Sequence, residues 1–129
     1  MLEVLPIQTK QEQEAACAAC NAEYREELLC YAAYVEGELM GICQFSLKPE
    51  GGIISSLDAK DGADFQTLFV LGRAAMSFIE ICGGETAFFD APVNEENKLL
   101  VGAIGFKQNE SGRYAVDLRG FFDHPCSHN

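Results

Sequence analysis

The sequence predicts an α+β domain with a mixed β-sheet, in the element order β-α-β-β-β-α-β-α-β-β. Short runs rich in β-branched and aromatic residues alternate with segments whose apolar residues recur every three or four positions. Gly, Pro and Asn cluster where these runs end. The chain has 129 residues, of which 48% are hydrophobic, and this length fits one domain with a single core.

The N-terminal segment predicts a strand followed by a helix. Residues 1–7 form a short, mostly apolar segment, as in a first strand. Thr9 is followed three positions later by Glu12, the spacing of a capping box in which each side chain satisfies the other residue's free N–H. We therefore expect a helix over residues 9–22.

The next segment predicts three antiparallel strands. Two β-rich runs, residues 28–35 and 39–47, flank Glu36-Gly37-Glu38 and indicate a hairpin. Pro49 and two adjacent glycines then break the chain before a strand over residues 53–57. These three strands form a meander.

The central segment predicts a crossover from one parallel strand to the next. Residues 65–82 carry one broad apolar stripe at helical spacing, and Gly83 and Gly84 follow the last apolar residue. Residues 85–90 then indicate a strand that ends before Pro92. A strand joined to another by one helix is expected to lie parallel to it, with a right-handed crossover.

The C-terminal part predicts a helix and a hairpin. Asn94 is the expected N-cap of a helix over residues 94–104, which Gly105 ends. A hairpin around residues 110–112 follows. In its second strand Tyr114, Val116 and Leu118 are expected to face one side of the sheet, and Ala115, Asp117 and Arg119 the other.

Charge and hydropathy exclude several classes of function. The 20 acidic and 9 basic residues give a net charge of -11, which disfavours binding to nucleic acid or to anionic membranes. No apolar run approaches the ~20 residues that span a bilayer, and the N-terminus lacks the pattern of a secretory signal. We expect a cytoplasmic protein with reduced cysteines.

The element order and one local motif resemble the N-acetyltransferase (GNAT) superfamily. The motif is NEENKLLVGAIGFK, residues 94–107, similar to the family helix that an Asn opens and Gly-Phe ends. Asn94, Leu100, Gly105 and Phe106 fall in register with it. The resemblance in element order covers nearly the whole chain, and it implies one domain, residues 1–129. The family's second N-terminal helix is missing or reduced to residues 23–27.

The resemblance implies an acetyl-coenzyme A site and an amine acceptor, either a small molecule or a protein amine. The main chain of Ser56, Leu57 and Asp58, the helix start near Gln66 and Thr67, and Asn94 are the implied cofactor contacts. Asp58 and Asp90 are the candidate general bases, because both follow parallel strands at the edge where open sheets bind ligands. Each also fits an ordinary turn or cap residue.

Two departures from the family pattern set this chain apart. The cofactor turn of the family carries Arg or Gln and then glycines, whereas this chain has Asp58, Lys60, Asp61 and Asp64 and no Gly between Asp64 and Leu71. We expect Asp61 or Asp64 to cap the helix with its own carboxylate, where a phosphate would otherwise lie.

The second departure concerns the proton donor for the leaving thiolate. The family often places a Tyr seven residues after the helix-opening Asn, and Val101 stands there in this chain. The other candidate proton donors are Tyr24, Tyr31, Tyr34 and Tyr114, although aromatic residues within apolar runs usually belong to the core.

Two alternatives to acetyl transfer follow from the sequence. One is a GNAT-fold domain that has lost the cofactor and binds a small ligand or a protein, as a possible homodimer. The other is a zinc or redox site made from Cys17, Cys20 and the C-terminal segment 124–128, which contains Cys126 between two histidines. A CxxC within a predicted helix, without a second such pair, argues against metal, and we assign no metal ligands.

Overall fold

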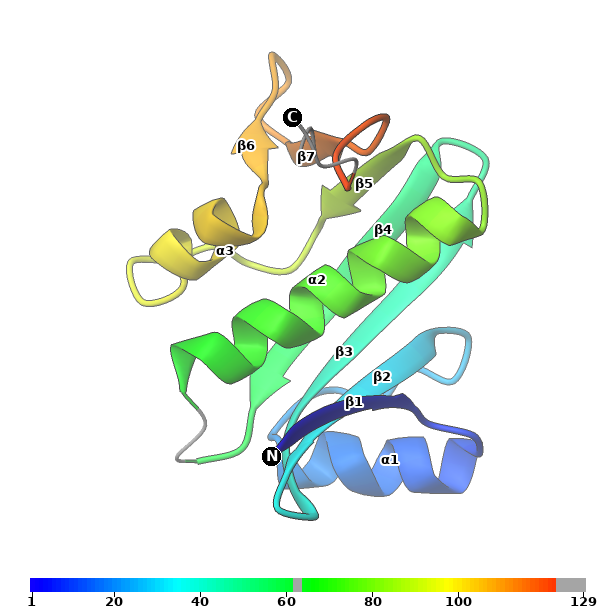
Figure 1. The fold of residues 1–129 in the computed structure, drawn as a ribbon, viewed down its shortest axis with the longest axis vertical. Helices are drawn as coiled ribbons and strands as arrows, with labels where there is room; N and C mark the ends of the chain where they lie inside the picture. Colours follow the sequence, from blue (N-terminus) through cyan, green and yellow to red (C-terminus); the bar gives the residue numbers. More distant parts are fainter. Residues whose placement is uncertain (62–63, 123–129) are drawn as a thin grey trace.

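The computed structural model describes residues 1–61 and 64–122. Its seven-stranded sheet has the order β1-β2-β3-β4-β5-β7-β6 and is crossed by the long helix α2 (Figure 1). The strands are β1 Leu2–Pro6, β2 Leu29–Val35, β3 Glu38–Lys48, β4 Gly51–Ala59, β5 Thr86–Phe89, β6 Lys107–Gln108 and β7 Tyr114–Asp117; the helices are α1 Lys10–Ala19, α2 Phe65–Ile81 and α3 Lys98–Ile104. The predicted α+β class and element order are confirmed.

The sheet contains one parallel pair, β4 with β5, and its other neighbouring strands are antiparallel. Helix α2 connects the two parallel strands, as the sequence predicts. Strand β7 lies between β5 and β6 because the last hairpin inserts its second strand next to β5. Tyr114, Val116 and Leu118 pack in or against the core beside α2, as expected from their alternation.

Two separate apolar clusters cover the two faces of the sheet. The larger one packs α2 and α3 on the sheet and includes Phe45, Ile54 and Met76. The smaller one lies under α1 and includes Cys17 and Ile42. Successive side chains along β3 and β4 therefore point alternately toward α2 and toward α1. This alternation sets the face of the sheet on which each polar residue of β4 lies.

Helix α1 begins as predicted and ends earlier. Thr9 is its N-cap, and its hydroxyl oxygen accepts the N–H of Glu12 at 3.1 Å. The reciprocal half of the capping box differs, because the Glu12 carboxylate accepts from the Thr9 hydroxyl and not from the Thr9 N–H. The helix ends at Ala19 and not at Ala22, since Asn21 adopts a positive φ of 58°.

Helix α3 is shorter than predicted. The regular helix starts at Lys98, and its N-cap residue is Asn97, not Asn94. The Asn94 side chain instead accepts the N–H groups of Glu96 and Asn97 at 2.9 and 3.0 Å, while the Asn97 side chain accepts the N–H of Asn94 at 2.8 Å. These reciprocal bonds hold residues 94–97 as a turn before the helix.

Strand β4 is longer than the predicted residues 53–57. It starts at Gly51 and continues to Ala59, so that Asp58 lies inside a strand and not in a turn. Residues 23–27 form no helix, in agreement with the sequence prediction. Within the described ranges, no helix is both long and apolar enough to cross a membrane.

Candidate functional site

The parallel strands β4 and β5 part at their carboxyl ends. They pair at Gly52–Ala87, Ile53–Phe88 and Ile54–Phe89, and the Asp90 N–H then donates to the Ile54 carbonyl at 2.8 Å. Beyond this bond β4 continues along β3 to Ala59, toward the start of α2, while the chain after β5 turns away to α3 (Figure 1). The main chain of β4 after Ile54 is thus not paired with β5.

Two local features cause the strands to part. Ser55 has no partner in β3, because Gln44 pairs with Ser56 and Phe45 with Ile54. An extra residue of this kind is a β-bulge, which bends its strand and increases the local twist. After β5, Pro92 has no N–H to donate to a neighbouring strand, so the ladder does not extend past it.

Asp58, a predicted catalytic residue, lies on the face of the sheet that carries α1. Its carboxylate accepts a hydrogen bond from the Ser56 hydroxyl at 2.6 Å, so two of the predicted site residues are in contact. Asp58 pairs across the sheet with Ile42, which belongs to the cluster under α1. Burial and then the negative charge of Asp58 raise the pKa of the Cys20 thiol to about 11. Leu57 points the other way, toward the core under α2.

A recess of about 210 Å³ opens beside Asp58, where the two strands part. Its wall combines both strand ends with the loop after α1. The lining residues include Ser55, Ser56 and Asp58 of β4, Ala91 and Pro92 after β5, and Glu23 and Arg25 of the loop. The recess therefore adjoins the parted strands, and its lining includes two acidic residues and Arg25, whose guanidinium is paired with Glu27.

A buried amide pair fixes the loop wall of this recess. Gln44, fully buried in β3, accepts from Gln13 Nε2 at 2.9 Å and from the Arg25 N–H at 3.2 Å. Its own Nε2 donates to the Glu23 carbonyl at 2.8 Å. These bonds hold residues 23–25 against the sheet, because a buried amide is costly to leave unpaired. This pair is not among the residues predicted from the sequence, although a Gln within the apolar run ICQF signals a buried polar group.

The start of α2 is occupied by the protein's own carboxylate. Asp64 is the N-cap, and its Oδ1 accepts from the Thr67 N–H at 2.8 Å and the Thr67 hydroxyl at 2.6 Å. These bonds lower the pKa of Asp64 below its usual range. The expected cap at Asp61 or Asp64 is thus found at Asp64. Gln66 is exposed in the first turn, whereas Thr67 is buried and bonded to Asp64.

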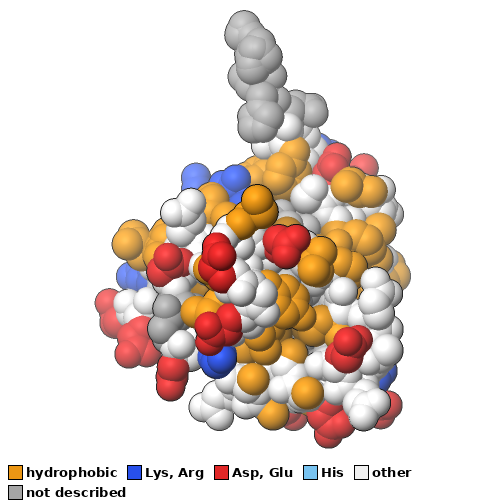
Figure 2. Space-filling model, turned by 60° about the horizontal axis from the view of Figure 1, so that its bottom comes forward, with side chains coloured by type: hydrophobic (Ala, Val, Ile, Leu, Met, Phe, Trp, Pro, Cys, Tyr) orange, Lys and Arg blue, Asp and Glu red, His pale blue; other side chains and the backbone are white. Residues whose placement is uncertain are grey.

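Basic side chains near this helix start bind other groups. Lys60 Nζ lies 3.0 Å from the Glu38 carboxylate. The Arg73 guanidinium lies over the Phe69 ring at 4.7 Å and donates to the Ile104 carbonyl at 2.7 Å. Figure 2 looks at the end of the molecule that lies at the bottom of Figure 1, where Asp and Glu surround apolar side chains and Lys and Arg are sparse. This surface disfavours a polyanion.

Asp90, the second predicted base, is not brought together with Asp58. Its two carboxylate oxygens accept from Arg113 at 3.0 and 2.9 Å, and Arg113 also donates to Glu50 at 3.0 Å. The guanidinium lies 3.9 Å from the centre of the Phe88 ring. Asp58 lies about 10 Å further along the strand direction than Asp90. Asp90 therefore serves as an ion-pair partner, a role that the sequence did not indicate.

Several other residues singled out in the sequence make contacts within the protein. Asn94 folds the turn before α3, and Val101, at the position of the family's Tyr, is fully buried in the core. Tyr114 lies on a strand next to the parted ends of β4 and β5, since it pairs with Phe89 at the end of β5. Its ring packs against the core, and Tyr31 stacks edge-on with Phe45 and Phe78 two strands away from β4.

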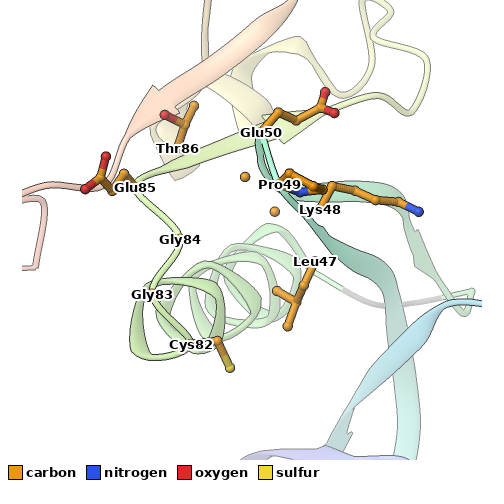
Figure 3. Close-up of a pocket in the computed structure, with 11 residues that line it drawn as sticks. Leu47, Lys48, Pro49, Glu50, Cys82, Gly83, Gly84, Glu85 and Thr86 are labelled. Atoms are coloured by element: carbon orange, nitrogen blue, oxygen red, sulfur yellow. The ribbon is translucent and has the colours of Figure 1, made fainter.

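A second recess, of about 280 Å³, lies at the opposite end of the β4–β5 pair. Glycines of the β3–β4 turn and of the end of α2 form much of its wall (Figure 3). In this view the charged ends of Lys48, Glu50 and Glu85 point away from the recess. The wall between these side chains is therefore mainly polar main chain.

The cysteines of the described ranges are buried thiols, except Cys82. Burial raises the pKa of Cys20 to about 11 and that of Cys30 to about 12, values at which thiolates are scarce at neutral pH. Across residues 1–61 and 64–122, no group of three His, Cys, Asp or Glu side chains is arranged to hold a metal ion. Cys126 and the two histidines of the zinc alternative lie outside the described residues.

The fold is similar to that of known N-acetyltransferases. The ribosomal-protein-S18-alanine N-acetyltransferase from Escherichia coli matches with a TM-score of 0.71 and 13% identity, covering 92% of this chain and 94% of that one. A Bacillus subtilis acetyltransferase in complex with CoA matches with a TM-score of 0.70, 16% identity and coverage of 92% and 99%. No protein-family model and no curated protein sequence matches the chain. The predicted GNAT fold is confirmed.

Acetyl-coenzyme A, which this fold family implies, fits one part of the site and not another. The parted strands leave β4 main chain free for an extended, amide-containing arm such as pantetheine. The start of α2 does not fit a pyrophosphate, because the negatively charged Asp64 carboxylate lies there and already binds the Thr67 N–H, one of the groups that such an anion would use.

Proposed function

We propose that this chain is an N-acyltransferase that holds the arm of an acyl thioester between the parted ends of β4 and β5 and transfers the acyl group to an amine. The observation that carries the proposal is the parting itself, because the ladder ends at the Asp90–Ile54 bond while β4 continues. A free strand edge binds an extended ligand through main-chain hydrogen bonds. The similarity to N-acetyltransferase structures supports the same reaction.

In this reaction an amine nitrogen forms a bond to the acyl carbon, the C–S bond of the thioester breaks, and the amine proton passes to the departing sulfur. Asp58 is the candidate base, since its carboxylate borders the recess next to the parted strands. The Ser56 hydroxyl orients this carboxylate through its 2.6 Å hydrogen bond. No side chain is assigned as the acid, because Val101 carries no proton to donate.

The recess beside Asp58 favours a small amine as acceptor. Its volume of about 210 Å³ suits a few non-hydrogen atoms. Asp58 and Glu23 attract an ammonium group, since the guanidinium of Arg25, the basic residue of the lining, is paired with Glu27. The net charge of -11 also raises the local concentration of cations. A polyanionic acceptor is disfavoured for the same reason.

Calorimetric titration with acetyl-coenzyme A and with S-acetylpantetheine tests the proposal. We expect at least one thioester to bind with a micromolar dissociation constant, and to release free thiol when a panel of small primary amines is added. An Asp58→Asn variant should bind the thioester equally well and transfer the acyl group more slowly. No binding of either thioester at about 1 mM would remove the enzyme from consideration.

A second candidate is a GNAT-fold module that binds a ligand or a protein without catalysis. It is favoured by the Asp64 cap at the usual cofactor helix and by the buried Val101. For this candidate, both thioesters fail to bind, and a small cationic ligand still perturbs the recess. Its homodimeric form is tested by sizing chromatography, in which elution as a monomer at high concentration would count against it.

A further inference from the structure

We infer that Asp64 is a specificity residue: it makes the site select thioester donors by their pantetheine arm and not by their nucleotide half. Donors without a pyrophosphate are then used about as well as acetyl-coenzyme A. This inference rests on the proposed acyl transfer, and it concerns which class of donor the site accepts.

The geometry of Asp64 removes the usual attraction of a helix start for phosphate. A free helix N-terminus offers unpaired N–H groups and a partial positive charge. Here Asp64 Oδ1 accepts both the N–H and the hydroxyl of Thr67, at 2.8 and 2.6 Å. The lowered pKa of Asp64 keeps its carboxylate ionised at neutral pH. A full negative charge therefore stands where the helix would otherwise attract an anion.

Nothing in the described part of the chain neutralises this charge. Asp64 makes no ion pair among residues 1–61 and 64–122. The nearest lysine in the sequence, Lys60, lies against Glu38 at 3.0 Å, and Arg73 lies over an aromatic ring. Like charges within a Debye length of ~8 Å repel appreciably. A pyrophosphate approaching α2 therefore meets repulsion without a compensating cation.

The cap and the charge of Asp64 can be separated by substitution. Asn and Ser cap helices about as well as Asp, because capping needs only a hydrogen-bond acceptor. Asp64→Asn and Asp64→Ser should consequently keep α2 folded while they remove the negative charge. A structural role alone predicts no change in donor selectivity from either variant.

The experiment measures dissociation constants of S-acetylpantetheine and acetyl-coenzyme A by calorimetry, in the intact protein and its variants. We expect the two constants to agree within about threefold in the unmodified chain. Asp64→Asn should tighten acetyl-coenzyme A about three- to tenfold, with less than a twofold change for S-acetylpantetheine. This gain should shrink at about 1 M salt, where screening shortens the Debye length to ~3 Å.

Glu80→Gln is the matched control, because it removes the same charge near the other end of α2, about 24 Å away. It should leave both constants unchanged. Acetyl-coenzyme A that binds tenfold or more tightly than S-acetylpantetheine would overturn the inference while supporting acyl transfer. Equal changes for both donors, or none, in the Asp64 variants would overturn the role of Asp64. Failure of both donors to bind any variant would remove the proposed function and this inference with it.

Discussion

The two ends of the β4–β5 pair are built in opposite ways. At the amino end the strands are packed so closely that a Cβ atom on Gly51 would lie 2.3 Å from the Thr86 carbonyl oxygen, and one on Gly52 would lie 2.4 Å from Ile79. At the carboxyl end the strands part after Ile54, and polar side chains line a recess. One pair of strands is thus closed at one end and open at the other.

Within this pair of strands, the closed end contributes to stability and the open end forms the proposed ligand site. The closed end has glycines because only glycine permits such close approach of main chains. Its packing leaves no room for ligand atoms between Gly51 and Thr86, and the recess of about 280 Å³ at this end lies beside the paired strands. The open end leaves main chain unpaired, which is tolerable where a ligand or water supplies the missing bonds. The following substitutions test the contrast, in order of decreasing effect.

The largest expected effect is at the closed end. Gly51→Ala places a methyl group against the main chain of β5 at a residue whose φ is 140°, a region that residues with a Cβ rarely adopt. Because the obstructing atoms belong to the backbone, we expect a loss of about 3 kcal/mol in the free energy of unfolding. Urea denaturation measures this. Gly102→Ala is the control, since open space surrounds this helix position, and it should be neutral or stabilising by about 0.5 kcal/mol.

The next effect is at the open end. Gln44→Leu keeps the volume of a side chain that is fully buried and removes three hydrogen bonds to Gln13, Arg25 and Glu23. We expect a loss of about 2 kcal/mol, because the partly buried Arg25 N–H and Glu23 carbonyl lose their bonds to Gln44, while Gln13 keeps those to the Arg25 and Leu28 carbonyls. Amide hydrogen exchange should also speed up in residues 21–28. Unchanged exchange in this loop would show that the amide pair does not hold the recess wall.

Arg113 connects the two ends through its ion pairs with Glu50 and Asp90 and its contact with the Phe88 ring. Arg113→Met should cost about 1 kcal/mol, since the side chain is partly exposed and solvent screens the pairs. Arg119→Met is the control, because its single pair with Asp117 is highly exposed, and it should cost much less. An equal cost for both variants, measured by thermal unfolding, would contradict a special role of Arg113.

The smallest effect is the pH dependence of the Asp64 cap. Hydrogen bonds from Thr67 lower the pKa of Asp64 in the folded state, so the cap stabilises the protein above the unfolded pKa of about 3.9. This contribution is lost as the pH falls through the lower folded value. The Tm of the unmodified chain minus the Tm of Asp64→Asn should therefore be smaller at pH 2 than at pH 7. A constant difference would contradict the assigned bonds.

The sequence predicts the order of elements well because the signals are local. Thr9 before α1, Gly83 after α2 and the alternation in β7 each specify their element from neighbouring residues. Boundaries are less well predicted where side chains replace main-chain partners. Asn94 and Asn97 bond to each other's N–H groups and delay α3, which no propensity indicates.

The candidate site is predicted only in part, because its contacts join distant segments. The sequence places Asp58 at the correct edge of the sheet and predicts a cap at Asp61 or Asp64. It cannot indicate that Gln13 binds Gln44, or that Arg113 takes the carboxylate of Asp90, since these pairs depend on the folded arrangement of β3, β5 and the last hairpin. Asp90 was a reasonable candidate base by position, and the ion pair gives it a different partner.

The most direct test of a ligand site between the parted strands is a titration with S-acetylpantetheine followed by backbone amide NMR shifts. The parting of β4 and β5 predicts that shifts concentrate in residues 55–59 and 91–94, with little change at residues 51–52 and 83–86. Shifts centred on the closed end, or spread evenly over the sheet, would contradict a ligand site at the opening.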